Sequence, residues 1–149
     1  MATVEKSVLV HFSAHQMYEL VKNVEHYPEF LPWCGAAGVE ELEAEDVQRA
    51  FVEIAFKGFR QRFTTRNTLN HDQQIFISLL NGPFTHLDGT WQFKALTPQA
   101  SKVHFKLDYE FSSKMLEQLV GPVFTSVANS LVDAFVKRAE RLYEQGAGA

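Results

Sequence analysis

The chain has 149 residues, a length typical of one globular domain and too short for two well-cored domains. Hydrophobic residues make up 46% of it, including 13 Phe, 4 Tyr and 2 Trp, which excludes a disordered chain and predicts an aromatic interior. The net charge of −4 argues against generic binding to a phosphate backbone, so DNA is not an expected partner. We expect a single domain over residues 1–149, with a core of about 3–145 and a frayed tail at 146–149.

Cysteine usage and apolar runs restrict the compartment. Cys34 is the only cysteine, so an internal disulfide and a thiolate zinc site are excluded, and a reducing compartment is favoured. No uninterrupted apolar run exceeds three residues, and the opening segment lacks a basic start followed by a hydrophobic stretch. We therefore expect neither a transmembrane segment nor a secretory signal, and a cytoplasmic protein that is at most peripheral to the inner membrane.

The first two elements are a strand and a capped helix. Residues 4–12 carry alternating and β-branched apolar side chains without Gly or Pro, which predicts a strand. Ser13 then caps a helix with Gln16 as its reciprocal partner. The apolar residues at helical spacing share one face of that helix, namely Met17, Leu20, Val21 and Val24.

The segment from Tyr27 to Gly35 is the most unusual in the chain. Pro28 and Pro32 disfavour a continuing helix and force a bent, aromatic connection. Two large apolar residues in a connecting loop are often lids, ligand contacts or interface anchors. The candidate contacts here are Phe30, Leu31, Pro32 and Trp33.

From about residue 39 to residue 111 the pattern predicts six short strands. Turn signals separate them at 45–46, 58, 70–72, 81–83, 88–89 and 98. The clearest strand is the last one, in which alternate residues from Val103 to Phe111 are apolar and the residues between them are polar. This alternation predicts an antiparallel sheet with one buried face.

After Ser112 and Ser113 the period changes to that of one long helix. Its apolar stripe comprises Leu116, Val120, Val123 or Phe124, Val127, Leu131, Phe135 and Leu142. The pair Gly121-Pro122 predicts a kink. The predicted fold class is therefore α+β, a curved seven-stranded antiparallel sheet covered by this helix.

A curved sheet that grips one helix tends to leave an apolar space between them, which is a candidate ligand pocket. The alternative is a dense core filled by Phe63, Trp91, Phe93, Phe105 and Tyr109, and composition does not separate the two.

Chemical motifs are weak. Trp33-Cys34-Gly35 lacks the second thiol of a dithiol motif, which makes Cys34 a small buried residue. His11 and His15 do not share a helical face, and His86 with Asp88 is most simply a solvated pair near a turn. No nucleophile elbow or phosphate loop is present, so we predict no catalytic residue, no metal site and no required cofactor.

One basic run interrupts the mixed charge pattern, comprising Lys57, Arg60, Arg62 and Arg66. Alternation places its three arginines on one strand face, which is either a solvated outer surface or a contact for RNA or anionic lipid. The acidic stretch at residues 40–46 is most simply a solvated hairpin end.

The sequence resembles the coenzyme Q-binding START-like proteins of the polyketide cyclase/SRPBCC family, which also include the bacterial ribosome association toxins. The matching segments are residues 13–18, Tyr27 to Cys34, Phe63 to Asn67, Gly82-Pro83-Phe84, Leu87 to Trp91 and Val103 to Phe111. The proline loop is the most specific of them. In the toxin branch basic residues follow the Gly-Pro-Phe turn, whereas Thr85 and His86 stand there in this chain.

The resemblance implies a helix-grip (START/Bet v 1-like) fold, an inner cavity suited to ubiquinone or another polyprenyl quinone, and a carrier or chaperone that supports respiration without catalysis. The expected ligand-binding residues are Phe30, Leu31, Pro32, Trp33, Phe63, Trp91, Phe105, Val123, Phe124 and Val127. The alternative is a toxin that binds the large ribosomal subunit and blocks subunit joining through the face from Lys57 to Arg66. Transient contact with a membrane surface is a further expectation, and an enzyme in the same cavity is the least favoured reading.

Overall fold

Seven strands form one antiparallel sheet in the computed structural model, which describes residues 2–56 and 58–144. The strand order is β1-β7-β6-β5-β4-β3-β2, so β1 and β2 lie at the two edges. The strands are β1 (Ala2–Val10), β2 (Cys34–Ala44), β3 (Val47–Phe56), β4 (Phe59–Asn70), β5 (Gln74–Asn81), β6 (Phe84–Thr97) and β7 (Ala100–Phe111). This arrangement confirms the predicted fold class and the six strands after the proline loop.

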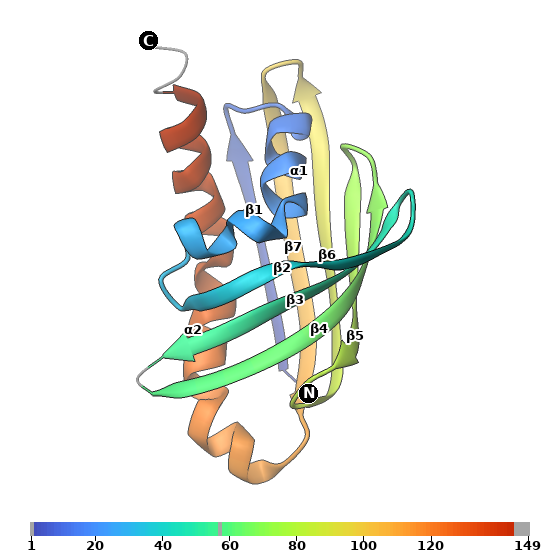
Figure 1. Cartoon of the computed structure of the whole chain (residues 1–149). Helices are drawn as coiled ribbons and strands as arrows, with labels where there is room; N and C mark the ends of the chain where they lie inside the picture. The colour runs from blue at the N-terminus through green and yellow to red at the C-terminus, as the bar shows by residue number, and fades with distance from the viewer. Residues whose placement is uncertain (1, 57, 145–149) are drawn as a thin grey trace.

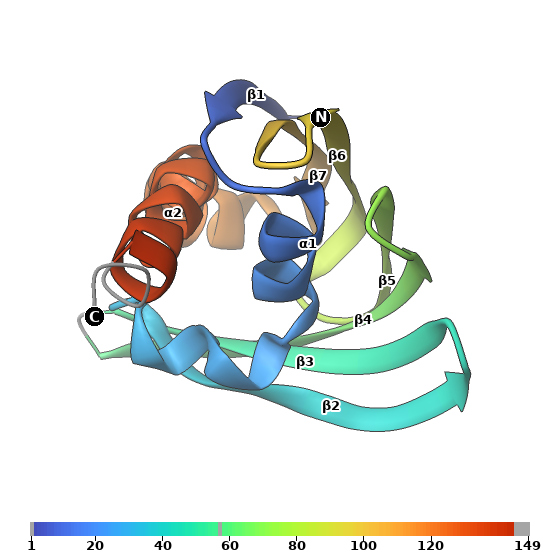
Figure 2. The ribbon, with the colours of Figure 1, turned by 90° about the horizontal axis from the view of Figure 1, so that it is seen from above.

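The helices lie within the curve of the sheet (Figures 1 and 2). They are α1 (Ala14–Lys22), the 3-10 helix η1 (Val24–Glu29), α2 (Lys114–Ala139) and the π-helical turn η2 (Glu140–Glu144). Figure 2 shows the sheet curling around α1 and α2, with η1 crossing beside β2 and β3. The single long helix therefore covers the apolar face of the sheet, as its amphipathic pattern predicts.

Local signals explain the start of both α-helices. Ser13 Oγ accepts a hydrogen bond from the Gln16 backbone N–H at 3.0 Å, and Gln16 Oε1 accepts one from the Ser13 N–H at 2.9 Å. This reciprocal capping box is the one predicted, and Ser113 caps α2 through its bond from the Leu116 N–H. Figure 1 also shows the first turns of α2 at an angle to the rest, which confirms a bend in a helix that contains Pro122.

Three predicted boundaries were wrong. The first strand ends at Val10 rather than Phe12, and β2 begins at Cys34, before the predicted start at residue 39. The pair Asp88-Gly89 is not a turn but lies inside β6, where a Cβ on Gly89 would come within 3.2 Å of Leu107 Cδ1. Glycine serves close packing at this point, a role that has the same sequence signature as a turn.

The predicted stripe of α2 is largely buried, with one exception. Val120, Phe124, Val127 and Phe135 face the sheet, whereas Leu142 is 43% exposed. The backbone widens to a π-turn at η2, which rotates the following side chains relative to an α-helical register. As a result Tyr143, not Leu142, turns inward, and its hydroxyl donates to the Gln16 carbonyl at 3.1 Å.

The segment Lys114–Glu144 passes a length and composition test for a membrane span, with a mean hydropathy of 1.5 over 18 residues. This segment contains no uninterrupted apolar run longer than three residues, so the expectation of no transmembrane segment did not take it into account. A core helix meets the same test, and α2 packs its apolar stripe on the sheet through Phe124 and Phe135. We therefore interpret α2 as the core helix of the domain. The predicted tail at 146–149 lies outside the described residues.

Candidate ligand cavity

A mainly apolar cavity of about 100 Å³ lies between the sheet and α2. Side chains therefore do not fill the interior completely, and the alternative of a dense core does not hold for this part of the interior. The cavity is smaller than the ~150 Å³ that holds one benzene ring in an engineered protein. Its lining residues are Val24, Tyr27, Trp33, Ala50, Val52, Ile54, Phe63, Thr65, Asn67, Ile77, Leu87, Trp91, Phe105, Leu107, Phe124, Val127, Ala128, Leu131 and Phe135.

Aromatic rings form the inner wall because alternate residues of β6 and β7 point to the same face. The Trp91 ring lies 4.4 Å from that of Phe105 and 5.2 Å, edge to face, from that of Phe135 on α2. Both β-strand residues are 2% exposed. These contacts hold the wall in place, so the hollow is bounded by a rigid aromatic surface.

The structure brings together six of the ten residues predicted to bind a ligand. Trp33, Phe63, Trp91, Phe105, Phe124 and Val127 all line the cavity. Of the others, Leu31 is buried at 1% exposure but does not line the cavity, Phe30 packs against Phe135 at 5.2 Å, and Pro32 and Val123 line an adjoining groove. Their role in binding stays a prediction.

Sequence reasoning missed a polar pair within the cavity. Thr65 and Asn67 are each 6% exposed, and the Thr65 hydroxyl donates to Asn67 Oδ1 at 2.8 Å. They follow Phe63 at alternate positions of β4, so the inward side of that strand changes from apolar to polar. That alternation is the signal that could have found them. The pair places hydrogen-bonding groups in an otherwise apolar space.

An open groove of about 530 Å³ adjoins the cavity and shares Trp33 and Val127 with it. Its other walls are the proline loop and the bent part of α2, through Pro32, Pro122, Val123, Ser126 and Ser130. Trp33 and Val127 therefore lie where the cavity and the open groove meet. Of the four candidate contacts in the proline loop, Pro32 and Trp33 line this groove, and their role in binding stays a prediction.

Aromatic contacts and an ion pair fasten the proline loop to α2. The Tyr27 ring lies 5.4 Å from that of Phe135. Arg138 donates to Glu29 Oε1 at 2.8 Å and lies over the Phe30 ring at 5.1 Å. Hydrogen bonds from His26 and Arg138 lower the pKa of Glu29. These contacts attach the proline loop to the C-terminal half of α2, and Pro32 and Trp33 of the same loop form one wall of the groove.

Tyr27 and Cys34 are titratable groups of the proline loop, and neither suits acid-base or nucleophilic chemistry. The Tyr27 hydroxyl donates to the Val21 carbonyl, and burial raises the pKa of Tyr27 far above its usual range. Burial also raises the pKa of the Cys34 thiol to about 11, so it stays protonated at neutral pH. Cys34 is buried at the start of β2, as a structural cysteine is expected to be.

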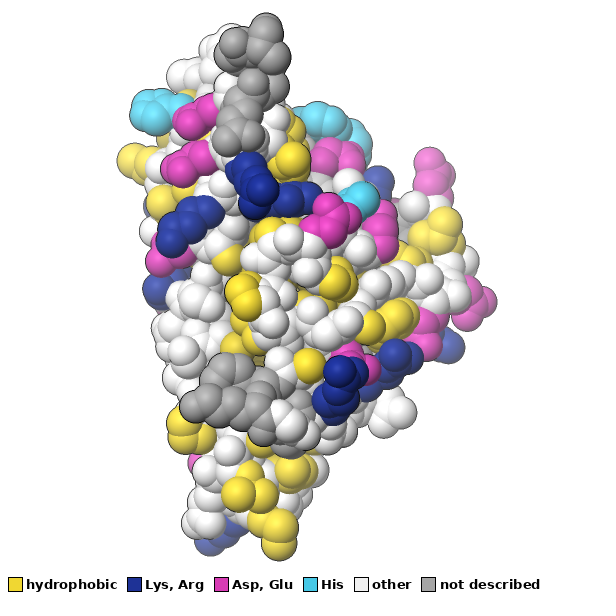
Figure 3. All heavy atoms as spheres, turned by 60° about the vertical axis from the view of Figure 1, so that its left-hand side comes forward, with side chains coloured by type: hydrophobic (Ala, Val, Ile, Leu, Met, Phe, Trp, Pro, Cys, Tyr) yellow, Lys and Arg dark blue, Asp and Glu magenta, His cyan; other side chains and the backbone are white. Residues whose placement is uncertain are grey.

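The predicted basic face is exposed but paired with carboxylates. Arg60 binds Glu53 at 2.7 Å, and Arg66 binds Glu43 at 2.8 Å, while Arg62 lies over the Phe51 ring at 4.2 Å. Figure 3 shows basic and acidic side chains next to one another along this edge of the molecule. The three arginines share one face as predicted, and Lys57 lies outside the described residues. The carboxylates neutralise much of the charge on which an RNA contact would depend.

The histidines differ from their predicted surroundings. His86 and Asp88 form a partly exposed pair at 3.0 Å, on β6 rather than at a turn. His15 contacts Asp72, which sequence reasoning did not connect with it because the two lie 57 positions apart.

Comparison with known proteins places these features in a family. Residues 10–136 match the family described as "Polyketide cyclase / dehydrase and lipid transport". The chain is 44% identical over 140 residues to ribosome association toxin RatA of Pseudomonas aeruginosa, covering 94% of this chain and 96% of that protein. It is 30% identical over 142 residues to the mitochondrial coenzyme Q-binding protein COQ10 homolog B of Xenopus laevis, covering 93% of this chain and 58% of that protein.

Solved structures share the fold. A START superfamily protein from Mycobacterium smegmatis matches with a TM-score of 0.75 and 23% identity, over 94% of this chain and 98% of that one. The Zhui aromatase/cyclase from Streptomyces sp. R1128 matches with a TM-score of 0.76 and 22% identity, over 94% of each chain. The helix-grip fold and the START-like resemblance are thereby confirmed. The chain belongs to the polyketide cyclase / dehydrase and lipid transport family.

Proposed function

We propose that the chain binds a hydrophobic small molecule, a polyprenyl quinone such as ubiquinone, and acts as its carrier or chaperone rather than as an enzyme. The observation that carries the proposal is the apolar cavity of about 100 Å³ under α2, which opens beside Trp33. The name of COQ10 homolog B, a coenzyme Q-binding protein, supports the class of ligand.

Hydrophobic area supplies the affinity in this proposal. Each buried methylene contributes about 0.8 kcal/mol, so a five-carbon isoprenoid unit contributes roughly 3 to 4 kcal/mol. Two or three units offset an association cost on the order of 4 to 15 kcal/mol. Because the cavity is only about 100 Å³, the ligand extends into the groove at Trp33 and Val123, or displaces α2 at its bend. Only part of a long tail needs to be covered.

The polar pair on β4 fits the quinone head. A quinone carbonyl only accepts hydrogen bonds, and the Asn67 side-chain amide is a donor within the cavity lining, oriented by the Thr65 hydroxyl that donates to its Oδ1. We place the head group beside them and the tail toward Trp33. The described lining residues include a single ionisable side chain, Tyr27, whose hydroxyl is bound to Val21. This composition supports binding rather than catalysis.

Extraction of the purified protein with organic solvent, followed by mass spectrometry, tests the proposal. We expect a polyprenyl quinone from wild-type protein and a much smaller amount from Ala128→Leu, whose added carbons enter the cavity. Ala134→Leu, the same change at a position on α2 outside the cavity lining, is the matched control and should retain the lipid. No quinone in any sample, or equal amounts in both variants, overturns it.

A second candidate is association with the large ribosomal subunit in the cytoplasm. Its support is the 44% identity with RatA, which is higher than the 30% identity with COQ10 homolog B. The face around Arg60 and Arg62 is the predicted contact, and its pairs with Glu53 would have to open in such a complex. Binding through phosphates would weaken steeply with salt.

Sedimentation of a lysate at low salt tests this second function. Co-migration with the large subunit that is lost in Arg60→Glu/Arg62→Glu supports it, provided that Lys94→Glu, an exposed lysine on β6, still co-migrates. Absence of the protein from the large-subunit fractions contradicts it.

A further inference from the structure

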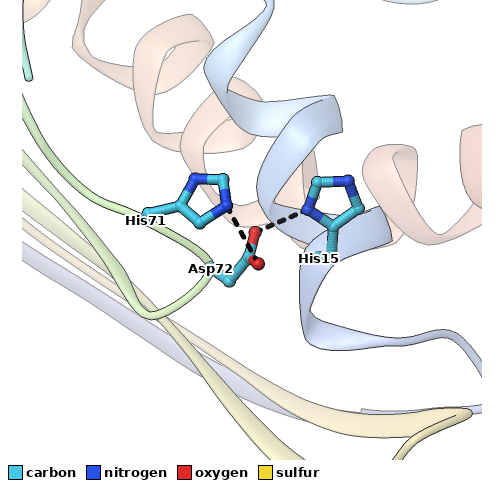
Figure 4. A group of neighbouring side chains, drawn as sticks. All are labelled: His15, His71 and Asp72. Carbon is cyan, nitrogen blue, oxygen red and sulfur yellow. Dashed lines mark hydrogen bonds and ion pairs between the residues drawn. The ribbon is translucent and has the colours of Figure 1, made fainter. Parts of the chain in front are cut away.

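A cluster of two imidazoles and one carboxylate lies outside the cavity, where the β4–β5 turn meets the start of α1 (Figure 4). His15 Nδ1 lies 2.7 Å from Asp72 Oδ1, and His71 Nε2 lies 3.2 Å from Asp72 Oδ2. One nitrogen or oxygen atom from each of the three residues lies within 4.8 Å of the others. Each carboxylate oxygen therefore faces one imidazole nitrogen.

The backbone makes this convergence possible. Neighbouring side chains normally diverge along an extended chain, yet His71 and Asp72 reach the same point. Asp72 has φ of 59°, in the left-handed region that Asp adopts at tight turns, and the Gln73 N–H closes the turn on the Asn70 carbonyl at 2.9 Å. The turn thus directs two possible metal ligands, His71 and Asp72, toward α1, where the capping box fixes the position of His15.

Packing beneath the cluster orients the imidazoles. The His71 ring contacts that of Tyr18 edge to face at 5.4 Å, and Tyr18 is 2% exposed. The two imidazole rings lie 5.8 Å apart. Tyr18 in turn contacts Phe93 of β6 at 5.9 Å, so the cluster rests on the rigid core. Its upper side opens to a groove lined by Ser13, Gln73 and Lys94, among others.

We propose that His15, His71 and Asp72 bind one Zn²⁺ ion. Zinc binds imidazole nitrogen and carboxylate oxygen at about 2.0–2.2 Å, which puts tetrahedral ligands about 3.4 Å apart. The ligand atoms of the three residues already lie within 4.8 Å of one another, and His15 and His71 are 56% and 72% exposed, so small side-chain rotations are not blocked by a buried environment. The ion takes the place of the direct contacts between the imidazoles and the carboxylate, and the groove leaves a fourth position for water. The site joins the β4–β5 turn to α1.

Calorimetric titration of the chelator-treated full chain with zinc chloride tests the proposal. We expect one ion per chain for the wild type, and affinity reduced roughly tenfold or more in His71→Ala and in Asp72→Asn. His86→Ala is the matched control, because His86 also pairs with an aspartate but belongs to no group of three possible ligands among the described residues. Binding should be unchanged in that variant.

Thermal unfolding supplies a second readout that does not depend on heat of binding. Zinc should raise the melting temperature of the wild type, and a chelator should reverse the increase, because an ion that binds only the folded state stabilises it. Asp72→Asn, which keeps the shape of the side chain, should melt at the same temperature with and without zinc. Lack of saturable binding by the wild type, or equal binding by His71→Ala and the wild type, overturns the proposal.

Discussion

The two faces of β4 differ in whether other side chains of the protein occupy the space next to them. On the inner face Phe63, Thr65 and Asn67 border a space that no side chain fills. On the outer face Arg66 is held by Glu43, and Arg60 by Glu53. A ligand that enters the apolar volume separates no ion pair, whereas a ligand of the outer face must first displace the carboxylates from the arginines. This difference favours the interior as the functional region.

The largest effect is expected for a core residue of α2 that lines the cavity. Phe135 is 1% exposed and contacts Tyr27, Phe30 and Trp91. Phe135→Ala should lower the free energy of unfolding by about 3–5 kcal/mol, as measured by urea denaturation. Leu119→Ala, at a position on α2 that is 69% exposed, is the control and should change it by less than about 0.5 kcal/mol. Similar losses in both variants would contradict the described core.

Filling the hollow should separate binding from folding. Ala128 is 1% exposed and lines the cavity, so Ala128→Leu should exclude about one isoprenoid unit. The loss of about 3–4 kcal/mol corresponds to a quinone affinity lower by roughly a hundredfold to a thousandfold. Overpacking costs about 1–3 kcal/mol of stability, which thermal unfolding will report. Unchanged affinity in Ala128→Leu would show that the ligand lies elsewhere.

The polar pair offers a smaller effect with a distinct signature. Thr65→Val leaves Asn67 without its hydroxyl donor and should destabilise the fold by about 1–3 kcal/mol. Replacing both residues, in Thr65→Val/Asn67→Leu, should cost less stability than the single change, because no buried group then lacks a partner. Both proteins should bind quinone more weakly than the wild type. Additive losses of stability would indicate that the two side chains do not act as a pair.

The smallest effect belongs to the outer face and depends on pH. The hydrogen bond from Arg66 lowers the pKa of Glu43, so the unfolded chain binds the proton more readily than the folded chain does. The resulting stability is present above the usual glutamate range and is lost as the pH falls through the lowered pKa. The melting temperature of Arg66→Ala should therefore approach that of the wild type in acid, while Lys94→Ala shows no such convergence. A difference that is the same at every pH would exclude the pair as its source.

Local patterns predicted most of the fold, and long-range contacts account for most of what they missed. The alternation from Val103 to Phe111 and the Ser13 capping box depend on neighbours in sequence, so both were correct. The sequence Asp88-Gly89 is typical of a turn, and the close packing of Gly89 against Leu107 leaves no different pattern in the sequence. Leu142 was predicted to be buried, but the π-turn at η2 leaves it exposed.

The candidate site shows the same limit. Aromatic residues of the cavity could be chosen from their strand and helix phase, and Trp33 from the odd composition of its loop. The Thr65 and Asn67 pair and the link from His15 to Asp72 could not, since polar residues acquire these partners only through the tertiary fold. The volume left between side chains is likewise a property of the packed interior.

Intrinsic fluorescence gives the most direct test, because the two tryptophans of the chain, Trp33 and Trp91, both line the cavity. Titration with a short-tailed ubiquinone analogue should produce saturable quenching in the wild type and in Ala134→Leu, and a curve displaced to much higher concentration in Ala128→Leu. Quenching that rises linearly without saturation, or to the same extent in all three proteins, would contradict a ligand site under α2.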